Sequence, residues 1–155
     1  MPAELTYYIY EGLLVGKIEN TFIQMSAVSG GGGGSKIRAG NDSTNNPYLT
    51  ALKEVEGTPG RVPHVHGGPI PLGRYKIDPP GKHPKLGRSA RLTPEQGTPM
   101  FNRDGFYIHG RGPHGSDGCV VPMKQDDFST LLTLLERSRG GTLFVLETTD
   151  GMRFG

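Results

Sequence analysis

The most informative stretch of this chain is FYIHGRGPHGSDGCVV, residues 106–121. Its apolar start, residues 106–108, is typical of a β-strand, and that strand delivers His109 at its end. Cys119 opens the next apolar run ten residues later. Fully extended, ten residues would span about 33 Å. The intervening glycines and proline let the chain fold back, so we expect His109 and Cys119 to meet.

A cysteine next to a histidine is the smallest pair of residues that can carry out nucleophilic catalysis by a thiol. A thiol near its ordinary pKa is mostly protonated at neutral pH, so Cys119 would need His109 to take its proton and later return one to a leaving amine. Gly118 allows a sharp turn that leaves its own N–H and that of Cys119 to form an oxyanion hole. Ser116 could bond within the loop or orient the imidazole. The alternative is that Cys119 is a small buried apolar residue and His109 a polar residue at a sheet rim.

The rest of the sequence predicts a mainly β fold of short strands with long loops. The chain has 155 residues, with 25 glycines and 13 prolines, which suits one loop-rich domain over residues 1–155 better than a helix bundle. Apolar and β-branched runs predict strands over residues 5–10, 13–18, 22–28, 74–77, 90–94, 106–108 and 142–148. Asn45-Asn46-Pro47 marks a turn, and we expect a short helix over residues 47–55.

One longer α-helix is predicted over residues 124–139. Phe128, Leu131, Leu132 and Leu135 have the i, i+3, i+4, i+7 spacing of an apolar stripe. Gly140 and Gly141 would end the helix. We therefore expect a β-sandwich or barrel with this helix packed against it.

Composition excludes several classes of function. The net charge is only +2 and no basic stripe is present, so we expect no nucleic-acid partner. No apolar segment is long enough to cross a bilayer, so we expect no membrane insertion. A single cysteine allows no internal disulfide. The five glycines of residues 30–34 predict a mobile surface loop, because such a run does not hold one conformation. A phosphate-binding loop would need a Lys-Ser/Thr pair at the start of a helix, which residues 35–38 do not supply.

The sequence offers two alternatives, a zinc site and a papain-like peptidase. His64 and His66, with His83 or His114, could suggest zinc, but no cysteine or carboxylate lies at ligand spacing, so we expect no metal and no cofactor. A papain-like peptidase would place its cysteine before its histidine, the reverse of the order here.

The segment from His109 to Val120, with Gly115-Ser116-Asp117-Gly118-Cys119, resembles the active-site motif of L,D-transpeptidases (the YkuD-type catalytic domain). Its short spacing is similar to the branch delivered by type VI secretion systems as peptidoglycan-targeting effectors. Further family-like marks are Val28-Ser29-Gly30, Asn45-Asn46-Pro47, residues 68–75, Leu92-Thr93-Pro94 and residues 106–110. Asp117 departs from the usual loop, which has histidine between serine and glycine.

The resemblance implies an L,D-transpeptidase-like fold and a substrate, the peptidoglycan stem peptide. Cys119 would be the nucleophile and His109 its base, with Gly118, Ser116 and Asp117 supporting the oxyanion site. Substrate carboxylates would be held by Arg111, His114 and Arg103, although each could also be a solvated loop residue.

The expected reaction is L,D-carboxypeptidase cleavage of the terminal D-alanine or its exchange for another D-amino acid. The alternatives are a housekeeping transpeptidase that forms cross-links and a non-catalytic peptidoglycan-binding module. An effector of this kind implies a cognate immunity protein and a component of the type VI secretion apparatus as partners. Because the N-terminus shows no export signal, we expect synthesis in the cytoplasm and delivery to the periplasm of target Gram-negative cells.

Overall fold

The computed structural model describes residues 2–31, 44–62, 66–110 and 117–149. Most of the five-glycine run lies outside these ranges, so the prediction of a mobile loop stays untested. Within them, one sheet contains nine strands: β1 Ala3–Tyr8, β2 Leu13–Ile18, β3 Thr21–Val28, β4 Gly73–Ile77, β5 Gly81–His83, β6 Gly87–Pro94, β7 Tyr107–His109, β8 Val121–Pro122 and β9 Gly141–Leu146. The α-helix of the described part is α1, Gln125–Ser138. The predicted class, mainly β with one packed helix, is confirmed.

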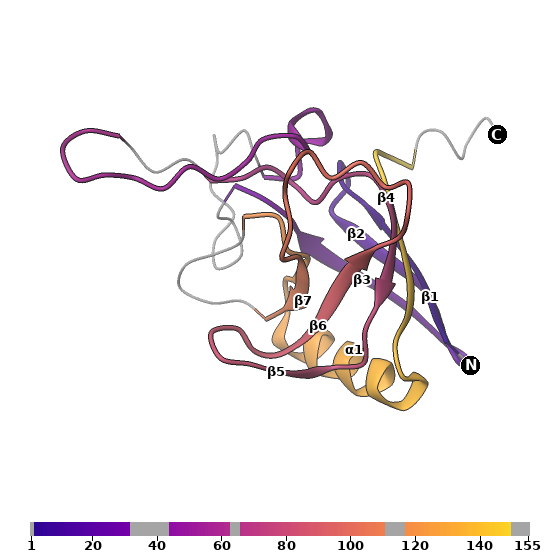
Figure 1. The fold of residues 1–155 in the computed structure, drawn as a ribbon. Coiled ribbons are helices and arrows are strands. Elements are labelled where there is room, and N and C mark those ends of the chain that lie inside the picture. The colour runs from indigo at the N-terminus through magenta and orange to yellow at the C-terminus, as the bar shows by residue number, and fades with distance from the viewer. Residues whose placement is uncertain (1, 32–43, 63–65, 111–116, 150–155) are drawn as a thin grey trace.

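The sheet curls into a half-barrel (Figure 1). Its order is β5-β6-β4-β9-β1-β2-β3-β8, and β7 pairs with β6 off this path. β1 and β9 run parallel at the centre, while β1 and β2 form an antiparallel hairpin. A parallel bridge between Ile108 of β7 and Val120, just before β8, joins the β7 branch of the sheet to its β8 end. We call this junction the seam.

Alternating side chains of the strands and one face of the helix build the core. Leu5 and Tyr7 of β1 face inward beside Leu143 and Val145 of β9, and all four are fully buried. On α1, the predicted stripe of Phe128, Leu131, Leu132 and Leu135 is buried, together with Leu134. This burial, and not intrinsic propensity, is the main stabilisation of so short a helix.

The helix ends slightly differently from the prediction. Arg139 adopts the left-handed conformation, with φ of 58°, and its N–H donates to the carbonyl of Glu136. Gly140 continues the turn with φ of 85°, and Gly141 already begins β9.

The predicted helix over residues 47–55 is wrong, apart from its first turn. Only a 3-10 turn forms, Pro47–Leu49, begun by the side chain of Asn46, which accepts from the N–H of Tyr48. The carbonyl of Leu52 accepts from the N–H of Gly68, so the chain leaves the helical path to pair with a distant segment. No helix among the described residues is both long and apolar enough to span a membrane.

Candidate active site

The seam brings His109 and Cys119 onto one side of the sheet. The N–H of His109 donates to the carbonyl of Val120 at 3.2 Å, and the N–H of Val120 donates to the carbonyl of Tyr107 at 2.9 Å. Because Ile108 pairs with Val120, Tyr107 is aligned with Cys119. Side chains alternate along a strand, so Ile108 and Val120 point into the core while Tyr107, His109 and Cys119 share the opposite face. Main-chain pairing therefore fixes where both predicted catalytic residues lie.

His109 is held in the form that a general base requires. It is 5% exposed, and its Nδ1 lies 2.8 Å from the carbonyl oxygen of Gly110. A carbonyl can only accept, so Nδ1 carries a proton and the second ring nitrogen, Nε2, is the basic one in the neutral imidazole. Burial lowers the pKa of His109, and the nearby His83 lowers it further, against the hydrogen bond to Gly110. The imidazole thus stays neutral into mildly acidic solution.

Cys119 rests as a thiol in a half-buried position. Burial raises its pKa to about 11, while the N–H of Tyr107, 3.3 Å from Sγ, works in the opposite direction. The thiol also faces the carbonyl of Gly105 at 3.8 Å. In general, a protonated thiol can pass its proton to a neutral imidazole within reach when an electrophile arrives.

A cleft of about 530 Å³ opens over this pair. His83, whose ring packs edge-on against that of Tyr107 at 5.0 Å, lines it beside the pair. Side chains of both charges line the rest: Lys53, Glu54, Lys85, Arg103, Asp104 and Asp117. Such a lining suits a ligand that carries both carboxylates and an amine.

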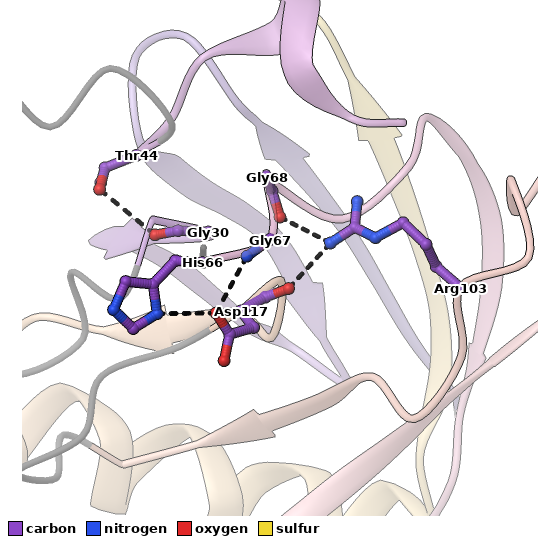
Figure 2. Close-up of polar contacts among 7 residues, drawn as sticks. All are labelled: Gly30, Thr44, His66, Gly67, Gly68, Arg103 and Asp117. Atoms are coloured by element: carbon purple, nitrogen blue, oxygen red, sulfur yellow. Dashed lines mark hydrogen bonds and ion pairs between the residues drawn. The ribbon is translucent and has the colours of Figure 1, made fainter. Parts of the chain in front are cut away.

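Asp117, which lies in the loop between His109 and Cys119, turns its carboxylate toward a neighbouring segment (Figure 2). Its Oδ1 lies 2.8 Å from Nδ1 of His66 and accepts from the N–H of Gly67 at 3.0 Å. These contacts connect the loop to residues 66–68. His66, weighed as a zinc ligand, is paired here with a carboxylate.

Arg103 contacts the same loop through its main chain, at the carbonyl of Asp117. It is 6% exposed, and its guanidinium donates to four main-chain carbonyls, those of Thr50, Gly68, Pro69 and Asp117. Figure 2 shows the side chain reaching both Gly68 and Asp117. The group also lines the cleft, but these contacts favour a positioning role over the predicted grip on a substrate carboxylate.

Gly118 can only be glycine at this place. Its φ is +139°, and a Cβ would lie 2.4 Å from the ring of Phe106 and 2.6 Å from Arg103. Its carbonyl accepts from the hydroxyl of Ser29 at 2.8 Å. The sequence marked Ser29 only as part of a family-like motif, because nothing local reveals a contact across 89 residues.

Three predicted site residues, Arg111, His114 and Ser116, lie outside the described residues, as does His64. Their roles stay predictions. Among the residues that the structure describes, no group of three metal-ligating side chains gathers.

Residues 52–145 match the Tlde1 domain family, a span that includes both His109 and Cys119. The chain belongs to the Tlde1 domain family. This family is the type VI effector, L,D-transpeptidase-like group that the loop motif resembles. Membership supports a peptidoglycan-modifying, effector-like function for this Tlde1 domain.

Two further comparisons add little to this assignment. An L,D-transpeptidase from Mycobacterium smegmatis shares 14% identity at a TM-score of 0.44. The match covers 92% of this chain and 58% of that structure, so the chain spans under two thirds of its length. No curated protein sequence matches the chain.

Proposed function

We propose that this Tlde1 domain is a cysteine enzyme that cleaves peptidoglycan stem tetrapeptides. The observation that supports this most is the seam, where Cys119 and His109 share one face beneath an open cleft. A non-catalytic module would have no need of a buried imidazole whose Nδ1 proton is fixed by a carbonyl.

The reaction would proceed through a thioester. His109 takes the thiol proton as Cys119 attacks the carbonyl of the third stem residue. The negative charge that develops on that oxygen is met by the N–H groups of Gly118 and Cys119. The C–N bond then breaks, and His109 returns the proton to the amine of the departing D-alanine.

The acyl group would leave by one of two routes. Water, activated by His109, gives a tripeptide, which is L,D-carboxypeptidase activity. The amine of a free D-amino acid gives exchange instead. We favour these two routes over cross-linking; in target cells they would remove the donor stems from which cross-links are made.

The mixed charge of the cleft supports a zwitterionic substrate. A third residue with a side-chain amine and carboxylate, such as meso-diaminopimelate, could meet Glu54 or Asp104 with its amine and Lys53 or Lys85 with its carboxylate. Arg111 and His114 remain proposed ligands of the substrate carboxylates.

The proposal is tested by product analysis. Wild type and Cys119→Ala are incubated with a purified disaccharide-tetrapeptide, with and without D-methionine, and the products are weighed by mass spectrometry. We expect loss of one alanine, and a D-methionine product when that amino acid is added, from the wild type alone. A dimeric cross-linked product would indicate the transpeptidase alternative. An unchanged tetrapeptide, with equal binding of both proteins to sacculi, would replace the enzyme with the binding module.

A further inference from the structure

Ser29 places a buried hydroxyl directly behind the catalytic loop. The residue follows β3 and is fully buried. The N–H of Ile70 donates to its Oγ at 3.0 Å, and the hydroxyl donates to the carbonyl of Gly118 at 2.8 Å. Since Ile70 already supplies a proton to this oxygen, the hydroxyl's own proton is the one that reaches Gly118.

The main chain of Ser29 is fixed as firmly as its side chain. Its N–H donates to Oδ1 of Asn45 at 2.9 Å, and the N–H of Asn45 donates back to the carbonyl of Ser29 at 3.0 Å. The hydroxyl of the buried Tyr7 also donates to Asn45 Oδ1, at 2.8 Å. The hydroxyl of Ser29 is therefore presented by a framework anchored in β1.

This contact sets the orientation of one peptide group. In a planar trans peptide, the C=O and the N–H point in opposite directions. Ser29 holds the Gly118 carbonyl, so the N–H of Cys119 points away from Ser29. The preceding carbonyl, of Asp117, is held by Arg103 at 2.8 Å. Two successive peptides beside the nucleophile are thus oriented by buried side chains from distant parts of the chain.

We propose that Ser29 is a positioning residue for acyl transfer, which orients the Cys119 N–H toward the oxyanion of the tetrahedral intermediate. This rests on the proposed function for its substrate, but the role belongs to attack on any carbonyl. Nothing in it requires Ser29 to touch the substrate or to alter the thiol itself.

Two reagents separate that role from a merely structural one. Iodoacetamide alkylates Cys119 by direct displacement of iodide and forms no oxyanion. p-Nitrophenyl acetate is attacked at its carbonyl, passes through an oxyanion and releases p-nitrophenolate as Cys119 becomes acetylated. For Ser29→Ala we expect acetylation to slow roughly ten- to a hundredfold, since misplacing a single donor has effects of this size. The alkylation rate should stay within about twofold of wild type.

The matched control is Ser138→Ala. The hydroxyl of Ser138 donates to the carbonyls of Leu135 and Gly140 at the end of α1. The Ser138→Ala variant therefore also loses a hydroxyl that binds the main chain. Both rates of this control should equal those of wild type. An equal slowing of both reactions in Ser29→Ala, or of neither, would overturn the proposal.

A third variant guards against misfolding. If Ser29→Ala does not fold, Ser29→Thr replaces it, because threonine keeps the hydroxyl. Its acetylation rate should lie within about fivefold of wild type. A normal alkylation rate together with an acetylation rate reduced more than about fivefold would overturn the proposal. The two proposals fail separately. A wild type that is acetylated but leaves the tetrapeptide intact contradicts the stem-peptide substrate, while the comparison of Ser29→Ala with wild type still decides the role of Ser29.

Discussion

The segment of residues 117–119 has two sides that are built differently, one facing the cleft and the other facing Ser29 and Arg103. On the cleft side, burial raises the pKa of Cys119 and lowers the pKa of His109, so each residue favours its neutral form. On the far side, Arg103 alone donates to four carbonyls, and Ser29 holds a fifth, that of Gly118. Side chains on the far side hold the main chain in place, which in the proposed reaction would let Cys119 and His109 react without rearrangement. Substitution of Cys119 or His109 should therefore reduce activity, and substitution of Arg103 should first reduce stability.

Among variants that keep the Cys119 thiol, His109→Gln should have the largest effect on activity. Glutamine is close in size but cannot take a proton from the thiol, so kcat should fall roughly 10²- to 10⁴-fold. Because His109 is neutral at pH 7, replacing it with another neutral residue of similar size should change the free energy of unfolding at that pH little. Steady-state kinetics and urea denaturation check both expectations. A variant that keeps a tenth of wild-type kcat would show that the imidazole is not the base.

The same residue sets the expected pH dependence. Burial lowers the pKa of His109, so kcat/KM of the wild type should fall only at a pH below 6.5, the ordinary value for histidine. The free energy of unfolding should also decrease as the pH falls. Below pH 6.5 the histidine is protonated in the unfolded state but still neutral in the folded state, and the decrease ends once the pH is below the pKa of the folded state. His109→Gln should lack this contribution to the decrease. Denaturation at several pH values measures the difference, and a midpoint of activity above 6.5 would contradict the assignment.

Arg103→Met should have the largest effect on stability. Methionine fills much of the space but leaves three buried carbonyls and the part-buried carbonyl of Asp117 without this donor, which we expect to destabilise the fold by about 2–4 kcal/mol. Activity should fall as well, since the Asp117 carbonyl is released. Arg74→Met is the control, because that arginine pairs with Glu95 at the surface. Equal stability of the two variants in urea denaturation would mean that the carbonyl contacts contribute nothing.

A smaller effect is expected for Lys85→Ala at the cleft. Loss of one exposed charge near an anionic substrate should raise KM about two- to fivefold and leave kcat unchanged, with the difference shrinking at high salt. Lys82→Ala is the control, because Lys82 belongs to the neighbouring strand β5 and does not line this cleft. If both variants change KM equally, net charge and not the cleft explains the effect.

Asp117→Asn should have the smallest effect. The carboxylate faces His66 and Gly67 near the surface, and asparagine can still accept from the N–H of Gly67. We expect less than about 1 kcal/mol in stability and less than threefold in kcat/KM. A hundredfold loss of kcat/KM would instead make Asp117 part of the catalytic machinery, as the sequence allowed.

The sequence predicted the parts of this fold that depend on local pattern. The helical stripe from Phe128 to Leu135 and the strand ending at His109 follow from apolar periodicity, and glycine content indicated that His109 and Cys119 could approach. The helix over residues 47–55 failed because Leu52 pairs with Gly68, a contact that local propensity does not register. The partners of Arg103 could not be predicted either, because every residue has a main-chain carbonyl and the sequence does not show which of them lie near the guanidinium.

The central claim is that Cys119 forms a thioester with the stem peptide. The most direct test mixes wild type with the disaccharide-tetrapeptide, quenches in acid at millisecond times and weighs the intact protein. We predict an added mass equal to the substrate minus D-alanine, mapping after digestion to the peptide that contains Cys119 and absent from Cys119→Ala. Release of D-alanine without any adduct on Cys119, or an adduct on another residue, would contradict the account.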